Sequence, residues 1–165
     1  MKIYQLKTVQ NLPIGIEEAW KFFSNPNNLS VITPEWLNFK IKSKLPEKMY
    51  SGMIIGYKVH PVLGIPLNWV TEITHVQEPF YFVDEQRFGP YKFWHHQHHF
   101  KESENGIEMT DIVSYAFPFD PFARLINSIL VVKKVIEIFK FREKKLAEMF
   151  PPVVANPSFA GRNNP

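Results

Sequence analysis

Residues 120–150 read DPFARLINSILVVKKVIEIFKFREKKLAEMF, and this stretch decides the fold. It opens with an aspartate suited to capping a helix and a proline at the first helical position, and the two prolines after it end the helix. Apolar residues recur at intervals of three and four, the pattern of one long amphipathic helix. They are Phe122, Leu125, Ile126, Ile129, Val132, Val135, Ile136, Phe139, Leu146 and Phe150. About 30 residues at ~1.5 Å each give a rod of roughly 45 Å, and we expect Ile129 and Ile136 to face its partner.

The sequence before this helix supplies that partner as a series of strands. Alternation of apolar and polar residues predicts strands at 2–12, 36–43, 53–59, 67–76, 80–88, 91–102 and 107–117. Two short helices are predicted at 16–23 and 25–32, and short turns between the later strands indicate antiparallel pairing. The predicted fold is therefore α+β: a seven-stranded antiparallel curved sheet wraps around the long C-terminal helix, and two short helices follow the first strand.

Composition excludes several classes of protein. The 165 residues favour one domain. The net charge of +3 is mild and sits mostly in the last helix, so we expect a solvated helix face and no nucleic-acid partner. The absence of cysteine excludes disulfides and thiolate chemistry. With no signal peptide and no long uninterrupted apolar run, we expect a cytoplasmic protein without stable membrane insertion.

Several motifs give this order of elements a family resemblance. They are Leu12-Pro13, FFSNPNNL at 22–29, FVDEQ at 82–86 with Gly89-Pro90, WHHQHHF at 94–100 and Met109-Thr110-Asp111. The chain resembles the START-like superfamily, also called SRPBCC or helix-grip proteins, and within it an uncharacterised bacterial subgroup near the polyketide cyclase/dehydratase-like proteins. The resemblance implies one ligand-binding domain over residues 1–150, and we expect 151–165 to be a flexible tail. It implies no particular reaction, because members of the superfamily differ in what they bind and many are not enzymes.

Four of the six histidines lie within residues 94–100, so the facing of this strand decides what they can do. Asn105-Gly106 is a strong signal for a two-residue hairpin turn, and residues directly opposite each other in a hairpin share a face. The predicted pairs are Glu104–Ile107, Phe100–Asp111, His98–Val113 and His96–Tyr115. The bulkier face of the last strand is taken as inward. We therefore expect Trp94, His96, His98 and Phe100 to point inward and His95, Gln97 and His99 outward.

The facing of the strand at 80–88 depends on the length of the turn that follows it. A two-residue turn directs the odd-numbered residues of this strand inward, and a three-residue turn directs the even-numbered residues inward. We favour the longer turn because it places Asp84 opposite His96 and Gln86 opposite Trp94. A buried carboxylate then has a partner, whereas an unpaired one is costly.

A cavity between sheet and helix would combine polar and aromatic side chains. The expected ligand-binding residues are Tyr57, Trp69, Thr71, Asp84, Gln86, Trp94, His96, His98, Asp111 and Tyr115. One interpretation is that the polar groups only satisfy one another in a buried network, and the other is that some contact a ligand. The two inward histidines lie about 6.6 Å apart along the strand, within chelating reach. Asp84 or Asp111 could be a third metal ligand, but without a third ligand at a fixed spacing we expect no metal or cofactor.

Three functions remain open from the sequence. The first is binding of a small hydrophobic or amphipathic molecule or a lipid. The second is an enzyme of cyclase, dehydratase or isomerase type that uses His96 or His98 with Asp84 or Asp111 for proton transfer, since no nucleophilic triad, phosphate loop or dinucleotide fingerprint is present. The third is an interaction module whose cavity is filled by its own side chains. A cavity that reaches His96 supports the first two, and a solid core supports the third.

Overall fold

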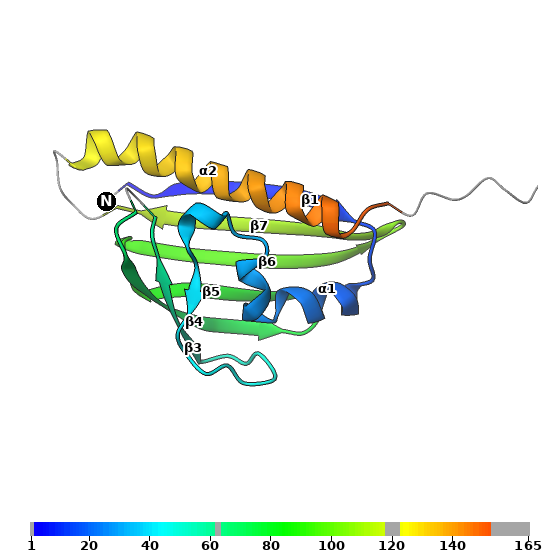
Figure 1. Ribbon diagram of the computed structural model, residues 1–165. Coiled ribbons are helices and arrows are strands. Elements are labelled where there is room, and N and C mark those ends of the chain that lie inside the picture. The colour runs from blue at the N-terminus through cyan, green and yellow to red at the C-terminus, as the bar shows by residue number, and fades with distance from the viewer. Residues whose placement is uncertain (1, 62–63, 118–122, 153–165) are drawn as a thin grey trace, which may run out of the picture.

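The computed structural model describes residues 2–61, 64–117 and 123–152, with side chains in the last helix from residue 131 onward. A strand and short helical segments are followed by six strands and a long helix (Figure 1). The elements are β1 (Tyr4–Leu12), α1 (Ile16–Phe23), the 3-10 turns η1 (Pro26–Ser30) and η2 (Glu35–Leu37), β2 (Lys40–Ile41), β3 (Met53–Val59), β4 (Leu67–Gln77), β5 (Tyr81–Phe88), β6 (Phe93–Ser103), β7 (Gly106–Ala116) and α2 (Ala123–Met149). The predicted α+β class and element order are confirmed. Of the predicted tail, residues 153–165 lie outside this description, as does the Asp120-Pro121 helix start.

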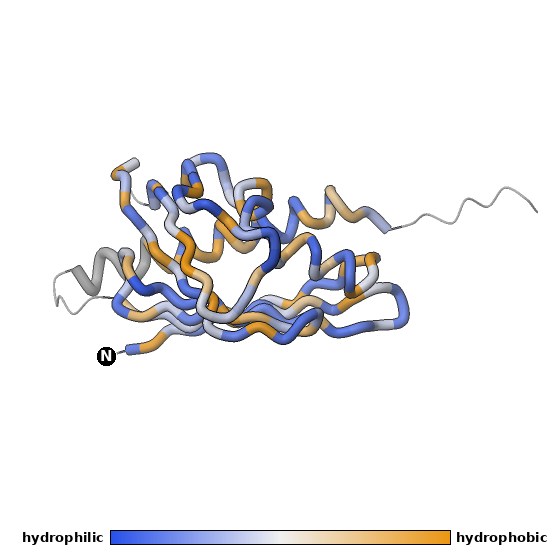
Figure 2. Tube along the Cα trace, turned by 90° about the horizontal axis from the view of Figure 1, so that it is seen from below, coloured by the Kyte–Doolittle hydropathy of each residue, from blue (hydrophilic) through white to orange (hydrophobic). Residues whose placement is uncertain are grey.

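The seven strands form one antiparallel sheet in the order β1-β7-β6-β5-β4-β3-β2. The helical connection after β1 lets the first strand pair with the last, so β1 and β2 are the two edges. Figure 1 shows α2 running along the sheet beside β1 and β7, and α1 lying nearer the β5 side. Hydrophobic and hydrophilic residues alternate along the strands (Figure 2), as expected of a sheet with one buried face.

The sequence prediction is wrong for residues 36–43. Only Lys40 and Ile41 form a strand there, paired with β3, and the preceding residues form η2. Asn38 ends this turn in the left-handed conformation with φ 44°, which asparagine tolerates better than most residues. The apolar residues predicted for this strand, among them Phe39, still pack against the core. The alternation therefore predicts which side chains are buried but not the conformation of the backbone.

The register of the β6–β7 hairpin differs by two residues from the predicted one. Ser103 lies opposite Gly106, so Glu104 and Asn105 form the turn. Gly106 follows that turn with φ 132°, and glycine is favoured directly after a type I turn. As a result His98 lies opposite Asp111, His96 opposite Val113 and Trp94 opposite Tyr115. Because the shift is an even number of residues, every side chain keeps the face that the sequence predicts.

Gly106 also lies where another segment approaches closely, which gives a testable prediction. A β-carbon on Gly106 would overlap the carbonyl oxygen of Leu12 and crowd the backbone of Pro13. We expect Gly106→Ala to lower the free energy of unfolding by at least about 1–3 kcal/mol, the cost of a non-glycine residue in such a backbone conformation. Gly15→Ala is the control, because Gly15 has φ −70° and open space around it; its expected cost is about 1 kcal/mol or less. Equal losses in denaturant titrations of the two variants would contradict this account.

The long helix is continuous from Ala123 to Met149, as predicted, but its inward face differs. Val135, Phe139, Arg142 and Leu146 are buried, whereas Ile136 is 38% exposed. The expectation that Ile136 faces the sheet is therefore wrong, and the side chain of Ile129 lies outside the described residues. The buried stripe runs through Arg142 because this cation pairs with a buried carboxylate on β7. None of the helices in the described part of the chain is long and apolar enough to cross a membrane.

Candidate functional site

Neighbouring strands bring four titratable side chains to one place on the inner face. Asp84 on β5 lies opposite His96 on β6, as predicted, and His98 lies opposite Asp111 on β7. His96 and His98 are only 6% and 4% exposed. The histidines on the other face of β6, His95 and His99, are half-buried. The predicted facing of the histidine strand is thus confirmed.

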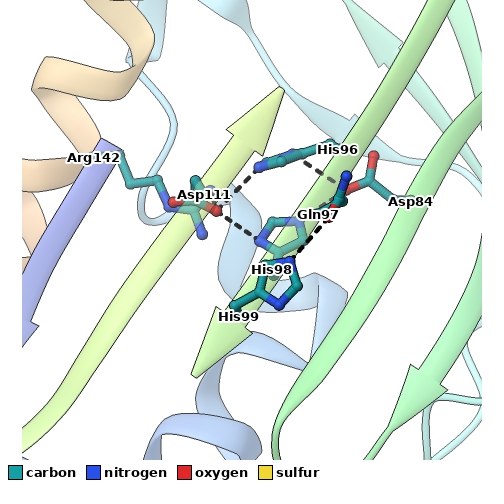
Figure 3. Close-up of polar contacts among 7 residues, drawn as sticks. All are labelled: Asp84, His96, Gln97, His98, His99, Asp111 and Arg142. Atoms are coloured by element: carbon teal, nitrogen blue, oxygen red, sulfur yellow. Dashed lines mark hydrogen bonds and ion pairs between the residues drawn. The ribbon is translucent and has the colours of Figure 1, made fainter. Parts of the chain in front are cut away.

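These four side chains form a closed ring in which each imidazole lies between two carboxylates (Figure 3). In His96, Nε2 is 3.0 Å from Asp111 Oδ1 and Nδ1 is 3.3 Å from Asp84 Oδ2. In His98, Nε2 is 2.9 Å from Asp84 Oδ2 and Nδ1 is 2.9 Å from Asp111 Oδ1. The His96–Asp111 contact and the His98 Nε2 contact with Asp84 have hydrogen-bond geometry. The buried His98 Nδ1 makes no hydrogen bond to the described residues, although it lies 2.9 Å from Asp111 Oδ1. The two imidazole rings lie against each other, with centroids 3.8 Å apart.

Arg142 on α2 completes the cluster from the opposite layer. Its Nη1 is 3.6 Å from Asp111 Oδ1 and its side chain is buried. The guanidinium lies over the rings of Phe23 and Phe139, at 5.5 and 5.9 Å from their centroids, which adds cation–π attraction. Sequence reasoning missed this residue and grouped it with the solvated charges of the helix. Its position three residues after Phe139 and four before Leu146, on the buried stripe, is the signal that could have found it.

The cluster keeps its carboxylates ionised. Burial alone raises the pKa of Asp84, but His96 and His98 outweigh it and hold that pKa well below its usual value. Burial likewise raises the pKa of Asp111, and Arg142 together with the two histidines holds it well below its usual range. For His96, burial lowers the pKa, but the carboxylates of Asp84 and Asp111 outweigh this and raise it. This is the direction expected if Asp84 contacts His96.

A cavity of about 180 Å³ lies between the sheet, the α1–η1 segment and α2. Most of its wall is apolar, formed by Phe22, Phe23, Leu29, Ile32, Leu37, Phe39, Ile55, Val59, Ile73, Phe82, Val135, Ile138 and Phe139. One part is charged, where Asp84, His96, His98 and Arg142 reach it. A cavity of roughly 150 Å³ holds a molecule of the size of benzene, so this one has room for a small ring. The interaction-module hypothesis required a solid core at His96, but His96 lines a cavity.

The structure brings most, but not all, of the expected ligand-binding residues to this cavity. Those that line it are Tyr57, Trp69, Thr71, Asp84, Trp94, His96 and His98. Gln86 does not, because its side-chain amide bonds the backbone of Tyr91. The β5–β6 pairing ends at Glu85 and His95, so it does not include the expected pair of Gln86 with Trp94. Asp111 lies behind the histidines, and Tyr115 stacks on Tyr4 in a separate apolar cluster.

Sequence reasoning expected the long helix to form part of the wall but named none of the residues that helical segments contribute. Asn25, Asn28 and Leu29 line the cavity from η1 and its flanks, and Ile138 lines it from α2. The apolar spacing of these segments was visible in the sequence. Which strand each segment covers depends on the path of the chain between β1 and β2, which local patterns do not encode.

Comparison with known proteins identifies the fold. No family model and no curated protein matches the sequence. Solved structures do match: a protein from Chromobacterium violaceum has a TM-score of 0.66 at 14% identity, with 90% of this chain and 98% of that chain covered. A protein from Arthrobacter aurescens has a TM-score of 0.63 at 12% identity, covering 95% and 92%, and one from Mycobacterium smegmatis 0.60 at 15%, covering 88% and 92%. At these identities the likeness shows a shared sheet-and-C-terminal-helix fold, which is compatible with a helix grip.

Proposed function

We propose that this chain is a START-like, helix-grip protein that binds a small hydrophobic or amphipathic molecule between its sheet and α2. The observation that carries the proposal is a cavity of about 180 Å³ with an apolar wall and one charged end. Sites for small molecules typically combine a mostly apolar lining with a few placed polar groups. The fold shared with the solved structures is compatible with this assignment.

The charged end favours a ligand with an oxygen acceptor. Arg142 lines the cavity, and its buried Nε has no hydrogen-bond acceptor within the described part of the chain. A buried donor without a partner costs about 1–3 kcal/mol, and a ligand oxygen would remove that cost. An amphipathic molecule with an apolar ring or chain and a carboxylate, phenolate or carbonyl oxygen therefore fits better than a plain hydrocarbon.

The proposal predicts that filling the cavity blocks binding. Ile138 lines the cavity and is half-buried, so in the Ile138→Trp variant the larger indole is expected to occupy ligand space. Purified protein incubated with cell extracts of small molecules and lipids is analysed by native mass spectrometry. We expect wild-type protein to retain a ligand of defined mass and Ile138→Trp to lose it. Ile136→Trp is the matched control, since Ile136 is an exposed residue of the same helix, and it should bind as wild type.

Two results would count against the binding function. One is wild-type protein that retains nothing from any extract, and the other is a ligand that Ile138→Trp retains as well as wild type. Circular dichroism of both tryptophan variants shows whether each is folded, so that loss of binding is not mistaken for loss of structure.

The second candidate is an acid–base enzyme of cyclase, dehydratase or isomerase type. It is favoured by the contact between His96 Nδ1 and Asp84 Oδ2 at 3.3 Å, because both residues also line the cavity. An imidazole beside a carboxylate can take a proton from a bound molecule and return it elsewhere. The captured ligand separates the two candidates: a binding protein releases it unchanged, and an enzyme releases it with altered mass or connectivity.

A further inference from the structure

The hydrogens available to the histidine cluster do not match the contacts that it makes. A neutral imidazole carries one hydrogen, on either Nδ1 or Nε2. In this cluster both nitrogens of His96 and both nitrogens of His98 lie within 3.3 Å of a carboxylate oxygen. With neutral rings, each histidine therefore directs one lone pair at a carboxylate. A positive charge among these atoms makes the arrangement favourable, either as a second proton on a ring, which the carboxylates around His96 promote, or as a bound metal ion.

One distribution of hydrogens leaves a single place for such a metal ion. His96 Nε2 has hydrogen-bond geometry to Asp111 Oδ1 and carries the hydrogen in this distribution. His98 Nδ1 is 2.9 Å from the same oxygen, and a rotation of the ring that aligns it with Asp111 lets it carry the other hydrogen. The remaining donors are then His96 Nδ1 and His98 Nε2, which both face Asp84 Oδ2. One ligand atom from each of these three residues lies within 4.8 Å of the others.

We propose that Asp84, His96 and His98 bind a divalent transition-metal ion, such as Zn²⁺ or Fe²⁺, at the wall of the cavity. Two imidazoles and one carboxylate are a ligand set that suits these ions. Bonds of about 2.1 Å in a tetrahedral site separate neighbouring ligand atoms by about 3.4 Å. The separations from Asp84 Oδ2 are 3.3 Å to His96 Nδ1 and 2.9 Å to His98 Nε2, so small outward rotations of the side chains make room for the ion.

The residues around the three ligands strengthen this assignment. Histidines that bind metals usually donate their other ring N–H to a carboxylate, which fixes the tautomer and the ring orientation. Asp111 Oδ1 accepts from His96 Nε2 and lies 2.9 Å from His98 Nδ1, and Asp111 is 4% exposed and held in turn by Arg142. The sequence shows no third ligand at a fixed spacing from the two histidines, because Asp84 comes from the neighbouring strand.

The fourth coordination position faces the cavity, since the three ligands line it and Asp111 does not. The two carboxylates carry two negative charges, whereas Arg142 and a divalent ion carry three positive charges. The surplus positive charge favours hydroxide or an anionic oxygen of a cavity ligand at the open position. The metal site itself does not depend on the ligand proposed above.

Metal titration of the untagged protein tests the site without any knowledge of the ligand. After treatment with a chelator, the protein is titrated with Zn²⁺ by calorimetry and with Co²⁺ by visible absorption, which reports coordination number. We expect one ion per chain with nitrogen and oxygen ligands. Asp84→Asn and His98→Gln should abolish stoichiometric binding, and Asp111→Asn should weaken it by about 10–100-fold because it keeps the ligand atoms and removes their support. His95→Gln and His99→Gln, outward on the same strand, should bind as wild type.

Wild-type protein also provides a test that does not depend on the folding of any variant. Addition of Zn²⁺ should shift the imidazole NMR resonances of His96 and His98 and leave those of His95 and His99 in place. Failure of wild type to bind any of Zn²⁺, Co²⁺ or Fe²⁺ at one ion per chain would overturn the proposal. So would binding that survives in folded Asp84→Asn, or resonance shifts confined to the outward histidines.

Discussion

Replacing Arg142 by methionine is expected to lower the free energy of unfolding by about 3–5 kcal/mol, the cost of removing one partner from a buried ion pair. Asp111 is 4% exposed and the Arg142 guanidinium lies 3.6 Å from it, so the variant leaves a buried carboxylate without its cation from α2. Methionine keeps much of the packing volume against Phe23 and Phe139, so the loss reports mainly on charge. The measurement is a urea titration in the presence of a chelator, because bound metal would add its own stabilisation.

The matched control is Lys140→Met, which makes a similar change at an exposed position of the same helix and should alter stability by less than about 0.5 kcal/mol. A double variant with Asp111→Asn tests the mechanism. Removing the carboxylate charge should recover part of the loss, so the double variant should be less destabilised than the sum of the two single variants. If the losses simply add, or if Arg142→Met is as stable as Lys140→Met, the ion pair does not hold α2 to the sheet.

The sequence predicts the strand faces well because alternation is a property of each strand alone. His96 and His98 are buried as expected even though the register of their hairpin is wrong by two residues. Register depends on the turn, and Asn105-Gly106 suits more than one turn type. An even error preserves the face, so the expected neighbours change while the inward set remains.

The need to pair a buried carboxylate predicts which face of β5 is inward. The sequence allowed two turn lengths, and the choice that gave Asp84 a histidine partner agrees with the observed pairing of Asp84 with His96. The same reasoning did not extend to Gln86, whose amide is satisfied by the backbone of Tyr91. Local backbone groups compete for buried side chains, and their positions are fixed only by the folded turn.

The sequence does not determine the rotation of α2 about its own axis, and so does not determine which of its faces packs against the sheet. Apolar residues surround the helix between 125 and 139 so broadly that several rotations bury a similar number of them. The choice among these rotations depends on contacts with residues far away in the sequence, above all that of Arg142 with Asp111. A charged residue on a helix is normally assigned to solvent. The contact between Arg142 and Asp111 depends on the packing of α2 against β7, which local sequence patterns do not predict.

The observed rotation of α2 determines which of its apolar residues contribute most to stability. Leu146→Ala is expected to lower the free energy of unfolding by about 2–5 kcal/mol, as large-to-small changes in a packed core do. Leu146 is fully buried in the cluster that contains Leu12 and Trp20, so its removal leaves a void between α2 and the sheet. Ile136→Ala on the same helix should cost less than about 1 kcal/mol, because Ile136 is 38% exposed. Thermal and urea unfolding of the two variants give the comparison directly, and a larger loss for Ile136→Ala than for Leu146→Ala would mean that the helix is rotated from the orientation described.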